Sequence, residues 1–173
     1  NVLHFARLYG VKRVIALAAG CGYPDVESPF KESDFFNGLP DMDSYGYSMA
    51  KKMLVIQSWA YRQQHNFDST ILLPANLYGE NDNFHPEDSH VVPALVRKFI
   101  EAKDSNAKEV EVWGTGNASR EFLYVKDCAK VIVDMLDKDC GSGPFNLGTG
   151  QSTSIKELVE TLKELTQFDG NIV

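Results

Sequence analysis

The chain has 173 residues, of which 43% are hydrophobic and 24% charged, and this globular composition argues against intrinsic disorder. Its net charge of −7 argues against a nucleic-acid partner, because binding to a phosphate backbone relies on clustered Lys and Arg. No apolar run approaches the roughly 20 residues that a membrane-spanning helix needs, and no basic and apolar leader opens the sequence. We therefore expect no membrane association.

The first quarter of the chain predicts a helix, a strand and a loop. Residues 1–9 have the apolar spacing of an amphipathic helix, and Gly10 suits its C-terminal cap. Residues 13–19 form a nearly continuous apolar run, which predicts a parallel strand covered on both faces. Residues 24–43 are rich in Pro, Gly, Asp and Ser and predict a long loop.

The next segment predicts a second helix and a second strand. Residues 47–66 return to helical periodicity, and their predicted apolar face consists of Met49, Met53, Ile56, Trp59 and Ala60. Residues 69–73 predict a buried strand. We expect residues 74–79 to form a loop at the edge of the sheet where ligands bind.

The second half continues the alternation. It predicts helices over residues 90–103 and 127–137, strands over residues 109–113, 121–125 and 144–147, and a last helix that ends near residue 166. Ser154 and Glu157 have the spacing of a capping box at the start of that helix. Alternating strands and helices predict an α/β fold with a parallel sheet.

The three cysteines, Cys21, Cys128 and Cys140, are odd in number and lack the paired spacing of zinc or thiol-redox sites. We therefore expect no metal site and a reducing, cytoplasmic location. Cys21 follows the first predicted strand, at the edge of the sheet where ligands bind. Taken alone, a free cysteine is more often a small buried hydrophobe than a site residue.

Tyr47 and Lys51 are four residues apart on a predicted helix, so both side chains leave the same face and can reach one site. A nearby ammonium stabilises a phenolate, which lets a tyrosine donate or accept a proton nearer neutral pH. Taken alone, this YxxxK pair is a weak signal, because a half-buried ring and a solvated amine have the same spacing. Its place between two predicted strands favours the catalytic interpretation.

The order of motifs along the chain is more specific than any one of them. The motifs are GCGYP at residues 20–24, YSMAK at 47–51, PANLYG at 74–79, NDNF at 81–84, SHVVP at 89–93 and WGTG at 113–116. In this order the chain resembles GDP-L-fucose synthases, a family of extended short-chain dehydrogenases/reductases. The resemblance covers essentially the whole chain and is most discriminating at residues 81–84 and 89–90.

The resemblance implies a Rossmann-like fold and a defined reaction. Enzymes of this family epimerise a GDP-4-keto-6-deoxymannose at C3 and C5 and reduce it at C4 with NADPH. Related enzymes form homodimers through the helix that bears YxxxK. We therefore expect NADP as cofactor, a GDP-sugar as substrate and a second copy of the chain as partner.

The resemblance also implies roles for individual residues. The implied catalytic residues are Tyr47, Lys51, Cys21 and His90, with Cys21 and His90 as the acid and base of epimerisation. The implied cofactor-binding residues are Tyr47, Lys51, Pro74, Ala75, Asn76, Leu77 and His90. The implied substrate-binding residues are Asn76, Lys98, Trp113 and Arg120. Ordinary packing or a strand-ending turn remains an alternative at these positions.

Two features depart from the family. The catalytic serine of the family falls at Ala19, and loss of one such donor can cost about 10²–10³ in rate. No Gly-rich dinucleotide motif precedes Asn1, so we expect an incomplete doubly wound parallel sheet that lacks its N-terminal strands and binds NADPH poorly. An impaired enzyme, another nucleotide-sugar epimerase or dehydratase, and an inactive nucleotide-sugar binding or assembly module remain alternatives.

We expect two regions. Residues 1–80 would form the C-terminal half of an NADP-binding domain, and residues 81–173 a small α/β substrate-binding region. Residues from about 120 to 150 would return to pack on the first region.

Overall fold

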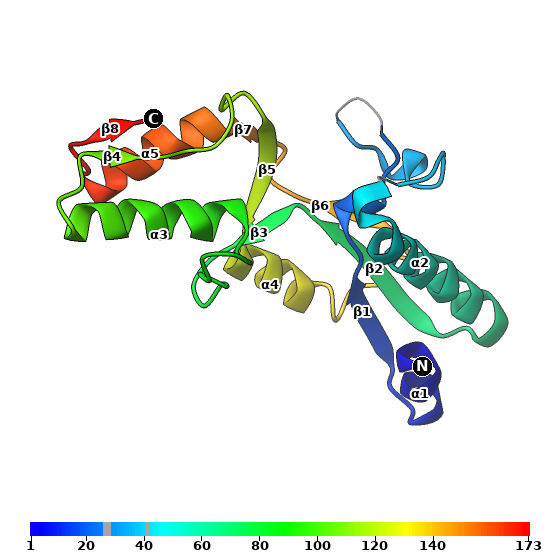
Figure 1. The fold of residues 1–173 in the computed structure, drawn as a ribbon. Helices are drawn as coiled ribbons and strands as arrows, with labels where there is room; N and C mark the ends of the chain where they lie inside the picture. The colour runs from blue at the N-terminus through cyan, green and yellow to red at the C-terminus, as the bar shows by residue number, and fades with distance from the viewer. Residues whose placement is uncertain (26–28, 41) are drawn as a thin grey trace. The chain divides into compact units, whose positions relative to one another are not determined.

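The alternation of strands and helices is present in the computed structural model, which describes residues 1–25, 29–40 and 42–173 (Figure 1). The chain divides into two units. Unit 1 comprises Asn1–Ala75 and Lys126–Gly148, and unit 2 comprises Asn76–Val125 and Thr149–Val173. Part of the long loop predicted over residues 24–43 lies outside the described residues.

Unit 1 contains a parallel sheet of three strands in the order β1-β2-β6. The strands are β1 (Arg13–Leu17), β2 (Asp68–Pro74) and β6 (Phe145–Leu147). Because β2 lies between two neighbours, residues 69–73 are buried, whereas β1 is half-buried along its length. The burial predicted for residues 69–73 is confirmed. The cover on both faces predicted for residues 13–19 is met only in part, and β1 ends two residues earlier than predicted.

The helices of unit 1 are α1 (Val2–Leu8), α2 (Tyr45–His65) and α4 (Val125–Asp134). Gly10 follows α1 with φ of +73°, a left-handed conformation that suits the predicted glycine cap. Three short 3₁₀ turns lie among the described residues between β1 and α2. They are η1 (Gly20–Gly22), η2 (Glu32–Asp34) and η3 (Met42–Ser44).

Helix α2 lies along β2, but with a different face from the predicted one (Figure 1). Its buried residues are Ser48, Lys52, Val55 and Ser58. Met53, Ile56 and Trp59 are 45%, 42% and 39% exposed, so the predicted apolar face was wrong as the face that packs on the sheet. Small serines let α2 approach β2, and the hydroxyls of Ser58 and Ser69 lie 2.7 Å apart.

Unit 2 contains short strands and two helices. The strands are β3 (Asn76–Tyr78), β4 (Glu109–Val110), β5 (Ser119–Tyr124), β7 (Ser152–Ser154) and β8 (Asn171–Ile172). The helices are α3 (Val91–Asp104) and α5 (Ile155–Thr166), which pack against each other (Figure 1). Strand β5 pairs in parallel with β3 and antiparallel with β7, and β4 pairs in parallel with β8.

Each unit has its own apolar core. In unit 1 it is formed by Ala18, Tyr23, Phe35, Val55, Ile71 and Leu73. In unit 2 it is formed by Leu95, Phe99, Ala102, Val110, Val159, Leu162 and Phe168. Phe35 and Phe99 are fully buried, one in each core.

Several predicted boundaries need correction in unit 2. The loop predicted over residues 74–79 contains β3, because the backbone there pairs with β5 rather than with solvent. The strand predicted over residues 109–113 is only β4, and β7 and β8 were missed because strands this short carry no periodicity. The capping box at α5 is confirmed: Ser154 and Glu157 exchange side-chain and backbone hydrogen bonds.

None of the helices in the described part of the chain combines the length and apolar character that a membrane span requires.

Candidate active site

The YxxxK pair lies on the first two turns of α2 in unit 1. The Lys51 ammonium donates to the carbonyl oxygen of Leu17 at 2.8 Å and lies 5.4 Å from the centre of the Tyr47 ring. Tyr47 is 57% exposed. The pair is therefore tied to the C-terminal end of β1, with the phenol open to a ligand, at the sheet edge where ligands bind in open α/β folds.

Cys21 lies on the 3₁₀ turn η1, directly beyond the same strand end. Its thiol is exposed and forms no disulfide. The amides of Gly22 and Tyr23 close the turn with hydrogen bonds to the carbonyls of Ala19 and Gly20, both at 3.0 Å. Cys21, Tyr47 and Lys51 thus belong to one structural unit, at one edge of one sheet.

Ala19 is the residue before this turn, and its methyl group supplies no hydrogen-bond donor. Ala18 and Gly20 on either side of it have no hydroxyl either. The strand end can therefore present a thiol and a phenol to a ligand but no serine.

Tyr23, a residue of the GCGYP motif to which the sequence assigned no role, anchors the Cys21 turn. Tyr23 is 4% exposed and donates to Asn146 Oδ1 at 2.7 Å. Asn146 in turn donates its backbone N–H to Glu32 and its side-chain amide to the Phe30 carbonyl. Burial raises the pKa of Tyr23 to about 12, and the nearby Glu32 carboxylate adds to the shift. No sequence spacing links these segments, which meet only because β6 lies beside β2.

The predicted cofactor-binding stretch runs from the end of β2 into β3. Pro74 ends β2, and the Ala75 amide donates to the Leu147 carbonyl at 2.8 Å. Leu77 pairs with Leu123 in the β3–β5 ladder, and Asn76 donates to the Glu121 carbonyl at 2.9 Å. Pro74 and Ala75 belong to unit 1, whereas Asn76 and Leu77 belong to unit 2.

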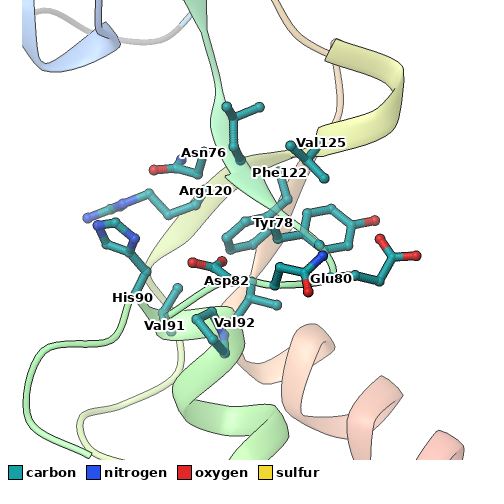
Figure 2. A pocket seen from close by; sticks show the side chains of 14 residues that line it. Asn76, Tyr78, Glu80, Asp82, His90, Val91, Val92, Arg120, Phe122 and Val125 are labelled. Atoms are coloured by element: carbon teal, nitrogen blue, oxygen red, sulfur yellow. The ribbon is translucent and has the colours of Figure 1, made fainter. Parts of the chain in front are cut away.

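Unit 2 contains a pocket of about 410 Å³ between β3, β5 and the start of α3. Figure 2 shows Asn76, His90 and Arg120 gathered at one end of this pocket and Tyr78, Glu80 and Val125 at the other. Four of the predicted site residues thus line one pocket: Asn76, Leu77, His90 and Arg120. Residues 80–82 also line the pocket. Asn81 and Asp82 belong to the motif at residues 81–84, but the sequence assigned no site role to any of the three.

The end of the pocket near His90 has the features of an anion site. His90 is the N-terminal cap residue of α3 and makes no side-chain capping bond. Val91 and Val92, the first residues of the helix, line the pocket, and the N-terminus of a helix attracts negative charge. Arg120 uses Nη1 to reach the Ser119 carbonyl at 2.8 Å, and its guanidinium has five N–H donors. A phosphate group would find both kinds of donor here.

Lys98 and Trp113 form a second predicted pair in unit 2. The Lys98 ammonium lies 4.9 Å from the centre of the indole ring and donates to the Glu111 carbonyl at 3.0 Å. Trp113 is 80% exposed, so the other face of its ring is available for stacking. The site residues as a whole divide between the units: Cys21, Tyr47 and Lys51 lie in unit 1, and His90, Lys98, Trp113 and Arg120 in unit 2. The pairing of Cys21 with His90 stays a prediction.

Known proteins are similar to this chain in sequence and in fold. GDP-L-fucose synthase 1 of Arabidopsis thaliana is 44% identical over 173 residues, which are 99% of this chain and 54% of the plant protein. A GDP-L-fucose synthetase from Naegleria fowleri, solved with NADP bound, is 30% identical with a TM-score of 0.91 over 100% of this chain and 56% of its own. A GDP-mannoheptose C4 reductase from Campylobacter jejuni with NADP bound is 31% identical, with a TM-score of 0.88 over 99% of this chain and 62% of its own.

The chain spans about half the length of the curated relatives it matches. Its α/β fold with parallel strands corresponds to part of a Rossmann-like short-chain dehydrogenase/reductase structure. Residues 1–148 match the model of the NAD dependent epimerase/dehydratase family. The chain therefore belongs to the NAD dependent epimerase/dehydratase family, within which it is similar to GDP-L-fucose synthases.

Proposed function

We propose that this chain carries the catalytic and nucleotide-sugar-binding residues of an NADP-dependent enzyme that epimerises and reduces a GDP-4-keto-6-deoxy sugar. The observation that carries the proposal is the Tyr47–Lys51 pair. The Lys51 ammonium donates a hydrogen bond to the Leu17 carbonyl, which holds the pair at the end of β1. The GDP-L-fucose synthases among the relatives support the choice of sugar nucleotide.

The two units have different proposed roles. Unit 1 would face the nicotinamide end of the cofactor, since Tyr47 is exposed and Lys51 offers N–H donors at the sheet edge. Bound NADPH would supply the hydride for reduction. Unit 2 would hold the GDP-sugar, with Arg120 and the start of α3 binding the diphosphate and Trp113 offering a stacking face.

The chemistry proposed for this chain is proton transfer at three atoms of the sugar. Cys21 and His90 would remove and return protons at C3 and C5, because a carbon next to a ketone needs one group on each face to be inverted. Tyr47 would donate a proton to the C4 oxygen as the ketone is reduced, and the Lys51 ammonium would stabilise the phenolate left behind.

The test uses the complete reading frame that encodes this chain, supplied with GDP-4-keto-6-deoxymannose and NADPH. Tyr47→Phe should lower the rate of NADPH oxidation by about 10²–10⁴ while leaving the affinity for GDP unchanged. Cys21→Ser should abolish incorporation of solvent deuterium at C3 and C5. Turnover by neither the unmodified protein nor an Ala19→Ser variant would contradict the proposal.

Ala19 favours a second candidate, a nucleotide-sugar-binding module without catalysis. The strand end lacks the hydroxyl that the family places there, and Ala19→Ser would restore it. If the module is inactive, GDP-sugar binds but neither deuterium exchange nor NADPH oxidation occurs. A rise of about 10²-fold in NADPH oxidation on Ala19→Ser would favour an impaired enzyme instead.

We also propose that the complete protein is a homodimer that pairs through α2. Met53, Ile56 and Trp59 form an exposed apolar stripe on this helix, which supports an interface there. Ile56→Asp should give a monomer in light scattering, whereas Gln57→Asp, one position along the helix and also exposed, serves as the matched control. A dimer that survives Ile56→Asp would contradict this interface.

A further inference from the structure

Lys52 follows the YxxxK lysine directly, but its side chain is buried rather than open to a ligand. It is 5% exposed. Its ammonium donates to the carbonyl oxygens of Phe35 at 2.6 Å and Gly38 at 2.7 Å. It also lies 5.3 Å from the centre of the Phe35 ring and 5.5 Å from that of Phe36. The adjacent lysines of α2 therefore hold two different segments: Lys51 binds the end of β1, and Lys52 binds residues 35–38.

Burial of an ammonium group costs more free energy than burial of an apolar side chain. Burial disfavours the charged form and lowers the pKa of Lys52. Among the described residues, no carboxylate forms an ion pair with it. Its partners are two backbone carbonyls of the segment between η2 and α2, so the charge serves to hold that segment against the helix.

The segment that Lys52 holds is the one that supports the Cys21 turn. Phe35 is fully buried, and its ring fills the space above Gly22, where an added Cβ would lie 2.5 Å from Phe35 Cζ. The same ring contacts Tyr23 edge to face at 5.1 Å between centres. Gly22 and Tyr23, the two residues after Cys21, therefore pack on the Phe35 ring. Lys52 binds the backbone carbonyl of the same phenylalanine.

We propose that Lys52 is a positioning residue for Cys21. Through the carbonyls of Phe35 and Gly38 it fixes the ring that supports the Cys21 turn, while Lys51 fixes the strand end on the other side of that turn. One helix therefore carries the reducing pair and also sets where the thiol of the epimerisation step lies. The catalytic part of this proposal rests on the proposed function, whereas the contact between Lys52 and the turn does not.

The structural part is tested on the 173-residue chain by amide hydrogen exchange. The reporters are the N–H groups of Gly22 and Tyr23, which close the turn, and the reference is Ile71, whose N–H donates to Ser142 within the core. Lys52→Met should speed exchange at Gly22 and Tyr23 by about tenfold or more and leave Ile71 unchanged. The matched control is Lys130→Met, the same change at an exposed lysine of α4.

Equal exchange at Gly22 and Tyr23 in Lys52→Met and Lys130→Met would overturn the proposal. If Lys52→Met also speeds exchange at Ile71, unit 1 has opened as a whole, and the milder Lys52→Gln is compared with Lys52→Arg. Faster exchange at the turn in the glutamine variant, restored by the arginine that keeps the donors, supports the proposal. Identical exchange in those two variants overturns it.

The catalytic part is tested in the complete protein by the ratio of two rates. These are solvent-deuterium incorporation at C3 and C5, which needs Cys21, and NADPH oxidation, which needs Tyr47. Lys52→Met should lower this ratio by about tenfold or more, because small misplacements of a reacting group are costly. A destabilised protein loses both rates together, so an unchanged ratio overturns the positioning role. Absence of both rates in the unmodified protein and also in Ala19→Ser would contradict the proposed function and leave the exchange experiment to decide on the contact.

Discussion

The two units hold their candidate site residues in different ways. In unit 1 the Cys21 turn and the YxxxK pair are fixed by Lys51, Lys52 and Tyr23, each bonded to a segment distant in sequence. In unit 2 the pocket residues are carried directly by secondary structure: Arg120 by β5 and His90 by the start of α3. The difference indicates that the site in unit 1 depends on packing, whereas the pocket in unit 2 depends mainly on backbone pairing.

The largest expected effect comes from removing the central aromatic ring of each core. Phe35 and Phe99 are both fully buried, so either change to alanine should cost about 3–5 kcal/mol of unfolding free energy. Phe35→Ala should also loosen the Cys21 turn, because its ring covers Gly22 and Tyr23. Phe99→Ala should leave that turn unchanged. Urea unfolding followed by hydrogen exchange of peptides from each unit measures both effects.

Phe84→Ala, at a residue that is 40% exposed, is the control for this pair and should change the unfolding free energy by no more than about 0.5 kcal/mol. If Phe99→Ala lowers the stability of peptides from both units equally, the two cores unfold together. The proposed difference between the units, a site in unit 1 that depends on packing and a pocket in unit 2 that does not depend on the core of unit 1, would then be wrong.

The next effect separates binding from chemistry. Arg120→Gln should weaken GDP binding by about 10- to 100-fold, because charge-assisted hydrogen bonds to phosphate contribute roughly 1.5–3 kcal/mol. Arg97→Gln is the matched control, since Arg97 lies on α3 and pairs with Glu101 at 2.9 Å. Calorimetric titration with GDP measures the affinities. Unchanged affinity for GDP in Arg120→Gln would show that the diphosphate does not bind at this end of the pocket.

The sequence predicted the parts of this molecule that depend on local pattern. The helix of Tyr47 and Lys51, the buried strand β2 and the capping box of α5 all follow from spacing or apolar runs. The buried face of α2 could not be predicted in this way. Ser58 packs on β2 and Lys52 on the segment of Phe35 and Gly38, while Met53 and Ile56 are exposed.

The anchors of the Cys21 turn were missed for a related reason. Asn146 meets Tyr23 only because β6 pairs with β2, and Lys52 meets Phe35 only because the segment after η1 folds back on α2. The contact of Asn146 with Tyr23 has no signature in the spacing of residues. A weak signal for Lys52 exists in its place one turn after Ser48, on a face that small residues leave open to close packing.

The two units should also differ in their response to alkaline pH. Burial raises the pKa of Tyr23 to about 12, above its ordinary value of 10.0, so the folded state favours the neutral phenol. Its contribution to stability is complete below pH 10 and is lost as the pH rises toward 12, where the unfolded state gains from ionisation. The change corresponds to about 2–3 kcal/mol.

Unfolding free energies of the unmodified chain and of Tyr23→Phe, measured for peptides of unit 1 between about pH 8 and pH 12, check this expectation. The unmodified chain should lose stability relative to the variant above pH 10. Tyr9→Phe, at an exposed tyrosine of the same unit, should follow the unmodified chain. A constant difference between Tyr23→Phe and the unmodified chain would show that Tyr23 does not titrate with unfolding.

The smallest effect lies at the acid end and belongs to unit 2. The Ser154 backbone N–H and hydroxyl, at 2.7 and 2.8 Å from Glu157 Oε2, lower the pKa of Glu157 below its ordinary value of 4.5. Stability from this contact is therefore complete above about pH 4.5 and is lost as the pH falls through the lower folded value.

Glu157→Gln should thus be slightly less stable than the unmodified chain at neutral pH and equal to it in acid. Glu160→Gln, at an exposed glutamate of the same helix that takes no part in the capping box, should show no such pH dependence. Hydrogen exchange of the first amides of α5, followed across the acid range, measures the difference in stability between Glu157→Gln and the unmodified chain. The capping contact joins Ser154 and Glu157 at the start of α5, so Tyr23→Phe in unit 1 should leave it unchanged. If Tyr23→Phe also changes how the stability of α5 depends on acid pH, the pH responses of the two units are not separate.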